Sequence, residues 1–335
     1  DVTARLEAAV VDGEFSFDKE KLGRVSEDKT AAERYKEIAL GMGGKELPLQ
    51  GLKVVLDCAN GCFSKIMPEV FAKLGADVTA LSCMPDGTNI NRDCGSQHID
   101  AMTAKVRDCG AMLGIAADGD GDRIIICDEK GNRVDGDQII AFLGKYYKEH
   151  NRLKADTVVA TIVSNPALDR FLEGIGVKCV RSAVGERYVI EEMKKCGSNI
   201  GGEESGHMVV ADYAKTGDTM MAALVIAMGL LQSGKKMSEI FPLFTSMTRK
   251  RIDSKFCGKD EMLAAFELAA FQAEIKQGEA DIAGKGRILV RKSGTEPKIQ
   301  VWVWGDDVPL ATAVSNRIAS VLEKADGFES RKEVL

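Results

Sequence analysis

The sequence lacks the marks of several protein classes. Only 6% of its 335 residues are aromatic, histidine occurs three times, and no stretch is of low complexity. Its nine cysteines form no Cys-x-x-Cys pair and no cluster with histidine, so neither a zinc ribbon nor a dithiol redox motif is indicated. Several of them, such as Cys127, lie in apolar runs where a buried free thiol is the ordinary state, which indicates a reducing cytoplasm.

Long hydrophobic runs and a basic surface are also missing. The most apolar helical segment, 220–231, is too short to cross a membrane, and no basic-then-apolar leader is found. We therefore expect a cytoplasmic protein without a membrane partner. The formal net charge is −6, whereas nucleic-acid binding needs a basic surface, so nucleic acid is not an expected partner. A small anionic ligand is compatible with this charge because a local pocket can oppose the overall sign.

Two common nucleotide-binding loops are absent as well. The segment 41–45, Gly-Met-Gly-Gly-Lys, has the wrong spacing for a P-loop, and no Gly-x-Gly-x-x-Gly string is present.

What the chain does contain is a regular alternation of short β-branched runs with helical stretches, which is typical of βαβ units and a mainly parallel sheet. Strands are expected at 51–57, 76–81, 111–117, 157–162 and 178–181.

The length predicts more than one domain, and the texture changes near residue 247. The last part of the chain predicts one long amphipathic helix over 259–276, a hairpin of 286–290 with 299–304, and a final helix over 309–324. The expected fold class is therefore α/β, with two similar mixed or parallel α/β domains followed by a smaller α+β domain. We place the boundaries at 1–30 for a polar helical segment, 31–134 and 135–246 for the α/β domains, and 247–335 for the α+β domain.

The strongest chemical signal is the segment 118–123, Asp-Gly-Asp-Gly-Asp-Arg, at the end of the apolar run 112–117. Asp118, Asp120 and Asp122 alternate with glycines, so their carboxylates can turn inward to one hard cation. Three carboxylates close together repel one another unless a cation is present. Mg²⁺ suits such a set if water and a phosphate oxygen complete its coordination.

Other interpretations of these carboxylates are open. In a calcium loop Glu129 would fill the twelfth position, but the sixth, which needs a turn glycine, is Arg123, and the flanks resemble strands. In a phosphatase of the haloacid dehalogenase type Asp118 would be the nucleophile and Asp120 the acid, but the usual Thr or Val after the pair is absent. A solvated acidic turn is the plain alternative.

A second polar loop spans 201–207, Gly-Gly-Glu-Glu-Ser-Gly-His. Glu203, Ser205 and His207 alternate, so in an extended loop they project to one side and suit the hydroxyls of a sugar ring. A glycine- and serine-rich turn with an exposed histidine is the alternative. Nearby, Asp218 is expected to cap the helix that follows it.

A third loop spans 291–297, Arg-Lys-Ser-Gly-Thr-Glu-Pro, between two strands with apolar residues at every second position. A guanidinium, two hydroxyls and a glycine that permits close backbone approach form an anion cradle, and Arg291 offers bidentate geometry to phosphate. A plain polar hairpin turn is the alternative. Arg187, at a strand-to-helix turn, is a weaker phosphate candidate, and an ordinary surface arginine would look the same.

The three loops, in this order, resemble the α-D-phosphohexomutase superfamily over nearly the whole chain. Its members have four domains and interconvert sugar 6-phosphates and sugar 1-phosphates. Further motifs are similar to the phosphoglucosamine branch, which in bacteria supplies glucosamine 1-phosphate for cell-wall precursors. These are Asp57-Cys-Ala-Asn-Gly61, Pro85-Asp-Gly-Thr-Asn-Ile-Asn91, Cys94-Gly-Ser96 and Gly185-Glu-Arg-Tyr-Val189.

The resemblance implies roles for matching positions. It makes Asp118, Asp120 and Asp122 the Mg²⁺ ligands, with Arg123 beside the family's phosphoserine. The residues that contact the substrate would be Glu203 and Ser205 on the sugar hydroxyls, His207 closing that motif, and Arg291, Ser293, Gly294 and Thr295 around the non-reacting phosphate. Glu204 stands where some members carry Met or Asn, so its role stays open.

The family's phosphoryl donor, a serine in a Ser-His-Asn-Pro string of the first domain, does not occur in this sequence. In the family that serine phosphorylates the substrate, the bisphosphate turns over in the cleft, and the other phosphate returns to the serine. Residues 1–30 resemble the end of that first domain and its linker. We therefore expect an isomerase family member that is inactive alone and binds a phosphosugar, with a homodimer expected of the full-length protein. The alternatives are a phosphomannomutase or phosphoglucomutase, or a non-catalytic sugar-phosphate binding protein.

Overall fold

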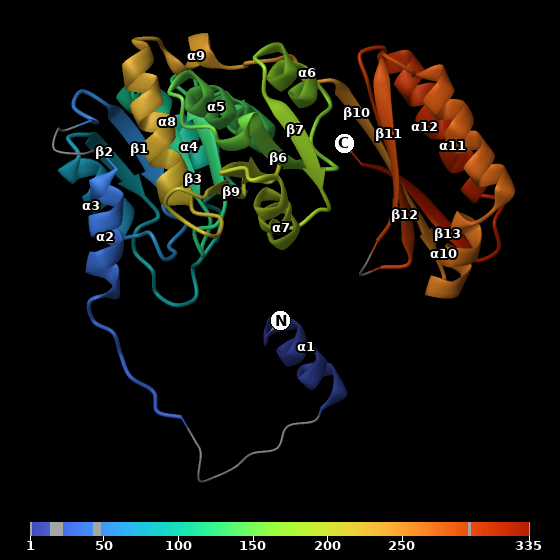
Figure 1. The fold of residues 1–335 in the computed structure, drawn as a ribbon, viewed down its shortest axis with the longest axis horizontal. Coiled ribbons are helices and arrows are strands. Elements are labelled where there is room, and N and C mark those ends of the chain that lie inside the picture. The colour runs from blue at the N-terminus through green and yellow to red at the C-terminus, as the bar shows by residue number, and fades with distance from the viewer. Residues whose placement is uncertain (1, 14–22, 43–47, 294–295, 335) are drawn as a thin grey trace. The chain divides into compact units, whose positions relative to one another are not determined.

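The computed structural model describes residues 2–13, 23–42, 48–293 and 296–334. The chain divides into two compact units, Asp1–Tyr35 and Lys36–Leu335. The first unit contains helix α1 (Val2–Asp12), and α2 (Ala31–Gly41) begins in it and ends in the second. The second unit holds three sheets (Figure 1). Among the described residues, no helix is both long and apolar enough to span a bilayer.

The first sheet has the strand order β2-β1-β3-β4-β5, with β1, β2 and β3 parallel and the last two strands antiparallel. Its strands and helices are β1 (Lys53–Asp57), α3 (Ile66–Lys73), β2 (Asp77–Leu81), α4 (Asp100–Cys109), β3 (Leu113–Ala117), β4 (Ile124–Asp128) and β5 (Arg133–Val134). Every residue of β3 and β4 is buried, because α4 packs on β3 and α8 (Thr219–Ser233) contacts both strands. Strands covered on both faces are apolar throughout, which explains the continuous apolar runs in the sequence.

The second sheet repeats the order, β7-β6-β8-β9, again with three parallel strands and an antiparallel fourth. Its elements are α5 (Gly136–Glu149), the short 3₁₀ helix η2 (Lys154–Asp156), β6 (Thr157–Thr161), α6 (Ala167–Gly174), β7 (Lys178–Ser182), α7 (Glu186–Cys196), β8 (Ile200–Gly202), β9 (Met208–Val210) and α9 (Met237–Ile240). Helix α8 contacts β9 and α5 of this domain as well as β3 and β4 of the first. It is buried from Thr219 to Leu230, which explains why its sequence is apolar on every side.

The third sheet is antiparallel, in the order β11-β12-β10-β13. Its elements are β10 (Thr248–Phe256), α10 (Lys259–Phe266), α11 (Ala269–Asp281), β11 (Gly286–Lys292), β12 (Lys298–Gly305), α12 (Val308–Leu322) and β13 (Phe328–Val334). Figure 1 shows α11 and α12 on the face of this sheet that points away from the two α/β domains. Alternate apolar residues of β12, such as Val301 and Val303, enclose a core with α12 on that face.

The predicted fold class, two similar α/β domains followed by an α+β module, is confirmed. The exact domain boundaries stay a prediction. One element was predicted wrongly, because the long helix over 259–276 is two helices, α10 and α11. The chain leaves the helical region at Leu268, where ψ is 127°, and this turns α11 against α12. The strands β5, β8, β9, β10 and β13 were not predicted, since they are short or carry charges at most exposed positions.

Candidate functional site

The three aspartates lie in the turn that joins β3 to β4. One carboxylate oxygen from each of Asp118, Asp120 and Asp122 comes within 4.8 Å of the other two, so the turn brings the predicted set together. Asp118 is buried, and its Oδ1 accepts hydrogen bonds from the backbone N–H groups of Gly121 and Arg123, each at 3.1 Å. These bonds hold the turn closed around its carboxylates.

One cation of the chain already lies beside this acidic group. Arg123 Nε donates to Asp118 Oδ2 at 2.6 Å and lies 3.6 Å from Asp122 Oδ1. Burial opposes the charge on Arg123, but the ion pair with Asp118 outweighs it and raises the pKa of the guanidinium. Asp122 Oδ1 is buried without a hydrogen-bond partner, which is costly unless an ion or water satisfies it. An oxygen-only, carboxylate-rich set with an unsatisfied buried oxygen fits a hard divalent cation such as Mg²⁺.

The calcium-loop interpretation finds no support in the position of Glu129. Its carboxylate accepts hydrogen bonds from the backbone N–H and the hydroxyl of Ser238, at 3.1 and 2.5 Å. A calcium loop needs its twelfth residue as a bidentate ligand, and its flanks are helices. Here the flanks are the strands β3 and β4, and Glu129 is engaged by the start of α9.

The β3–β4 turn that contains the three aspartates is called the metal turn here. Two glycine contacts support it from neighbouring loops. A Cβ on Gly61 would lie 2.2 Å from the carbonyl oxygen of Gly119, and one on Gly95 would lie 2.7 Å from that of Ala117. Only glycine permits these backbone approaches. Buried Asp57 holds the Gly95 segment, because its Oδ2 accepts from the Gly95 N–H at 2.9 Å. Asp57 opens the Asp57-Cys-Ala-Asn-Gly61 motif, which resembles the phosphoglucosamine branch, and the structure gives it this supporting contact.

The second loop forms the turn between β8 and β9, and its alternating polar residues do project to one side. Glu203 Oε2 lies 3.1 Å from Ser205 Oγ and 3.0 Å from His207 Nδ1, and the hydroxyl is 3.1 Å from the same ring nitrogen. Glu203 Oε1 accepts from the N–H of Gly185 at 2.6 Å. Burial favours the neutral acid, but hydrogen bonds led by the one from His207 lower the pKa of Glu203, so it is ionised.

His207 connects this loop to the metal turn. Its Nε2 lies 2.9 Å from Asp122 Oδ2, while Nδ1 faces Glu203. Because each ring nitrogen lies against a carboxylate oxygen, both are placed to donate, and this arrangement favours the protonated imidazolium. Burial opposes this charge, but the carboxylates of Glu203 and Asp122 raise the pKa of His207. The backbone joins the turns too, since Ile124 N–H donates to Gly206 O at 3.0 Å.

Helix α8 begins beside the same turns. Asp218 caps it by accepting from the N–H of Met221 at 3.1 Å, which confirms the predicted cap. The next residue, Thr219, donates its N–H to Gly121 O at 3.0 Å and its hydroxyl to Arg123 O at 2.8 Å. The metal turn is therefore held from three sides, by the loops of its own domain, by the β8–β9 turn and by α8.

The third loop lies at the β11–β12 turn. Arg291 stands opposite Gln300 in the strand register, and Ser293 Oγ accepts from the N–H of Glu296 at 3.4 Å. Gly294 and Thr295, the other predicted phosphate ligands, lie outside the described residues. Within the described part of the chain, no hydrogen bond or ion pair joins Arg291 or Ser293 to the metal turn. Their predicted role at a substrate phosphate stays a prediction.

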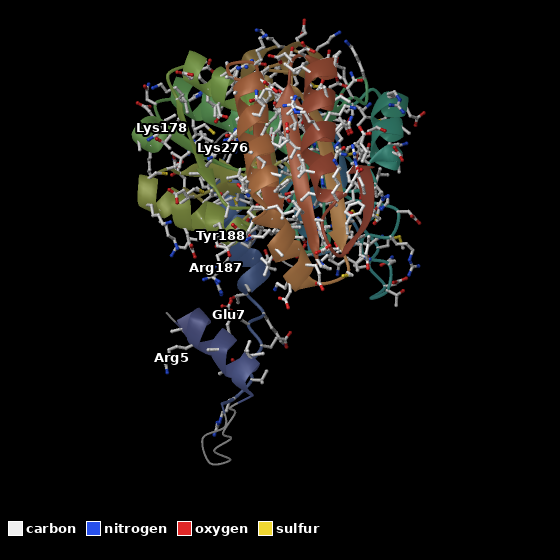
Figure 2. All side chains as sticks on the ribbon, turned by 90° about the vertical axis from the view of Figure 1, so that its right-hand side faces the viewer. Arg5, Glu7, Lys178, Arg187, Tyr188 and Lys276 are labelled. Carbon is white, nitrogen blue, oxygen red and sulfur yellow. The ribbon has the colours of Figure 1, made fainter. Side chains whose placement is uncertain are left out.

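Arg187, the weaker phosphate candidate, is the second residue of α7. It lies at the start of α7 beside Tyr188 (Figure 2), and its Nε donates to Glu191 on the same helix at 3.0 Å. The backbone just before it does contribute, because Gly185 binds Glu203. The position of Arg187 at a strand-to-helix turn is as expected, but its phosphate role stays a prediction.

Comparison with known proteins accounts for this arrangement. Three family models of phosphoglucomutase/phosphomannomutase match in order: α/β/α domain II at residues 35–131, α/β/α domain III at 135–247 and the C-terminal domain at 254–321. Phosphoglucosamine mutase of Paramagnetospirillum magneticum is 44% identical over 308 residues, which are 91% of this chain and 68% of that protein. The chain belongs to the α-D-phosphohexomutase superfamily. Within it the chain is most like the phosphoglucosamine mutases.

Other relatives agree. Phosphoglucosamine mutase of Caulobacter vibrioides is 43% identical, over 91% of this chain and 67% of that protein, so the chain spans about two thirds of the length of these relatives. Among solved phosphohexomutase structures, a phosphoglucomutase/phosphomannomutase family protein from Burkholderia thailandensis superposes with a TM-score of 0.76 at 18% identity, covering 97% of this chain and 70% of that one. N-acetylphosphoglucosamine mutase of Aspergillus fumigatus, in complex with GlcNAc-6P and magnesium, gives 0.67 at 18% identity over 89% and 67%. At such identities the likeness is one of fold.

Proposed function

We propose that this chain provides the metal, sugar and phosphate loops of a phosphoglucosamine mutase, which interconverts glucosamine 6-phosphate and glucosamine 1-phosphate. The observation that carries the proposal is the contact of His207 with both Asp122 and Glu203. A phosphosugar mutase must hold its transferring phosphoryl group beside a sugar hydroxyl. The direct link between a carboxylate-rich turn and a turn of sugar-type donors and acceptors supports such a site.

The residues of the two turns have distinct proposed tasks. Glu203, as an ionised acceptor, and Ser205, as a donor or acceptor, bind sugar hydroxyls. His207 keeps the Glu203 carboxylate oriented and supplies positive charge between the two turns. The guanidinium of Arg123 faces the place where charge develops on the transferring group and stabilises it there.

The metal turn is proposed to bind Mg²⁺ through Asp118, Asp120 and Asp122. With Mg²⁺ bound there, these residues would place a charge that neutralises the phosphoryl group during its transfer. Arg291 and Ser293, with Gly294 and Thr295, are proposed to bind the phosphate that does not react. Support for this last assignment comes from residue chemistry and family resemblance.

The phosphoryl donor of the family is a serine that has no counterpart within these 335 residues, because the Ser-His-Asn-Pro string is absent. We therefore propose that the polypeptide binds a hexose phosphate weakly and does not isomerise it by itself. The predicted domain boundaries and the homodimer of the full-length protein belong to the same proposal.

The test is calorimetric titration of the purified chain with glucosamine 6-phosphate in the presence of Mg²⁺, followed by assay of glucosamine 1-phosphate formation. The proposal expects binding that weakens when Mg²⁺ is chelated, and no product. Binding of neither glucosamine phosphate would contradict the assignment of the loops. Product formation by the chain, freed of other mutases, would contradict the proposed need for an external donor.

Related assays separate the alternatives. Preferential binding of mannose 6-phosphate or glucose 6-phosphate would indicate a phosphomannomutase or phosphoglucomutase instead. Metal-dependent release of inorganic phosphate from the sugar phosphate, without isomerisation, would indicate the phosphatase chemistry of an Asp118 nucleophile. If supplying a phosphoserine-carrying first domain of a relative in trans never yields product, a non-catalytic sugar-phosphate binding protein becomes the better description.

A further inference from the structure

Glu204, whose role the sequence left open, points away from the sugar-binding residues on either side of it. Glu203 and Ser205 bind one another and His207, whereas both carboxylate oxygens of Glu204 accept from Arg249 Nη1, at 2.8 and 2.7 Å. Arg249 is the second residue of β10, the first strand of the C-terminal module. A single ion pair thus joins the sugar loop to the module that carries the third loop.

The base of this ion pair is held firmly on both sides. On the sugar-loop side, the N–H of Gly136 at the start of α5 donates to Glu204 O at 3.2 Å, and a Cβ on Gly136 would lie 2.6 Å from that oxygen. On the other side, the guanidinium of Arg249 lies 5.1 Å from the ring centroid of Trp302 on β12. Each partner therefore contacts a second element of its own domain, Glu204 through α5 and Arg249 through β12.

The chain that connects the two domains is clamped next to this pair. The side-chain amide of Asn165 accepts from the N–H of Met247 at 3.1 Å and donates to the C=O of Met247 at 2.9 Å. Gln138 binds Leu243 N–H and Phe244 O in the same way, at 2.8 and 2.9 Å. Behind these clamps, the C-terminal sheet presents an apolar cluster to the second α/β domain, formed by Ala167, Met247, Trp302 and Trp304 with Val163, Phe244 and Leu289.

We propose that the Glu204–Arg249 ion pair is a positioning contact that couples the sugar loop to the phosphate loop, so that one hexose phosphate is bound by both loops at once. Arg249 lies on β10, which pairs with β12, and β12 in turn pairs with β11, the strand that ends in Arg291 and Lys292. The contact therefore links the turn at 203–207 to the sheet that carries Arg291 and Lys292. Neither Glu204 nor Arg249 is proposed to touch the substrate.

The inference rests on the proposed function, since it names what a sugar-phosphate site needs beyond its ligands. A phosphosugar has its hydroxyls and its far phosphate at a fixed separation. If the two loops are held at that separation before binding, less ordering cost accompanies binding, and affinity rises without any new ligand contact. A ligand that reaches only one loop, such as inorganic phosphate, gains nothing from the coupling.

The chain provides a matched control. Arg170 on α6 pairs with Asp306 just after β12 at 3.0 Å, so this ion pair joins the same two domains. It involves neither loop, and its side chains are 52% and 61% exposed, against 32% and 34% for Arg249 and Glu204. If the ion pairs only hold the two domains together, breaking either pair should weaken hexose phosphate binding to the same extent. If Glu204–Arg249 couples the two loops, only its loss should weaken that binding.

The test is a double-mutant cycle of E204Q, R249Q and the combined variant, with R170Q and D306N as controls, in the full 335-residue chain. Binding of glucosamine 6-phosphate is measured by calorimetry, and binding of inorganic phosphate by ³¹P NMR titration. We expect each single variant to weaken hexose phosphate binding at least about fivefold, with the double variant no weaker than the weaker single. Phosphate binding and both control variants should stay within about twofold of the parent.

Three results would overturn the inference. The first is unchanged hexose phosphate binding in E204Q and R249Q, the second is equal losses in the controls, and the third is a parallel loss of phosphate binding, which indicates general loosening. If the parent binds no hexose phosphate, the proposed function fails, and amide hydrogen exchange still decides the coupling. R249Q, but not D306N, should then speed exchange at Glu203 and Gly206, and unchanged exchange there would refute it.

Discussion

The two α/β domains have the same strand order and place their polar turns at the same point, between the third strand and the antiparallel fourth. In the first domain that turn holds three aspartates, and in the second it holds Glu203, Ser205 and His207. The flanking strands differ, because β3 and β4 pair over five residues whereas β8 and β9 pair over three. The metal turn is supported by its own sheet, and the sugar turn depends more on its neighbours.

The difference shows how one hairpin geometry serves two chemistries. The metal turn closes on itself, with Asp118 accepting two backbone N–H groups of the same turn. The turn of Glu203, Ser205 and His207 has its own hydrogen bond, from Gly206 N–H to Glu203 O at 3.0 Å, and is also held by Gly136, Gly185, Ile124 and Arg249 from other parts of the chain. Both turns therefore combine their own hydrogen bonds with contacts from other segments of the chain.

The largest expected effect comes from separating the two turns. In G206A the new Cβ would lie 2.4 Å from the carbonyl oxygen of Ile124, at a residue with φ of +104°, so backbone must shift. We expect the free energy of unfolding to fall by about 3 kcal/mol, measured by urea denaturation. G234A is the control, because Gly234 also has positive φ (+63°) but meets nothing within 4 Å. It should lose only about 1 kcal/mol, and equal losses would contradict the importance of the junction.

The next largest effect is expected from Asp137, the second residue of α5. Burial, with Glu204 nearby, raises the pKa of Asp137 from 3.8 to about 7. Between pH 4 and 7 the unfolded chain has lost this proton while the folded protein keeps it, so stability should fall as pH rises through that window. D137N removes the fall and should be more stable than the parent at pH 8 by about 2 kcal/mol. Urea denaturation at several pH values measures this.

The control for that experiment is D135N. Asp135 caps α5 by accepting from Gln138 N–H, and asparagine caps a helix about equally well. This variant should keep the pH dependence of the parent. A D137N protein whose stability follows the same pH curve as the parent would show that the buried carboxyl does not retain its proton.

The metal turn is tested through its exposed ligand. Asp120 is the only exposed member of the Asp118, Asp120 and Asp122 group, so its change disturbs the fold least. D120N should weaken Mg²⁺ binding at least about tenfold, because a charged ligand is lost. Titration with Mn²⁺, followed by EPR, measures this loss. D108N removes an exposed carboxylate that pairs with Lys105 on α4, and it should bind the ion like the parent.

The smallest effect is expected from His207, which lies between the carboxylates of Asp122 and Glu203. The pKa of His207 is raised, so its contribution to stability is complete below the ordinary histidine pKa of about 6.5 and is lost as pH rises through the folded value. In chelator, H207Q should be less stable than the parent by about 1 kcal/mol at pH 6, and the gap should shrink at pH 9. H98Q, at an exposed site, should show no gap at either pH.

Much of this protein could be read from local patterns. Apolar runs bounded by turn residues predicted most strands of the two α/β domains, and the Asp, Glu, Ser and His spacing predicted which side chains gather in each turn. The prediction of one long helix over 259–276 was wrong, because the amphipathic pattern continues through Leu268 although the backbone leaves the helical conformation there. β10 and β13 were missed because their charged residues, such as Arg251 with Asp253, satisfy one another on a partly exposed surface.

The sequence by itself determined the fold class, the family and the gathering of three aspartates in one turn, because these depend on periodicity and on short strings that fold locally. Only the tertiary structure decided that His207 lies between Asp122 and Glu203, and that Glu204 turns from its neighbours to Arg249 in another domain. Residues 85 or 45 positions apart along the chain carry no mutual signal in a single sequence. Their contact depends on how three sheets pack together, and that is settled by burial and close backbone approach at Gly206 and Gly136.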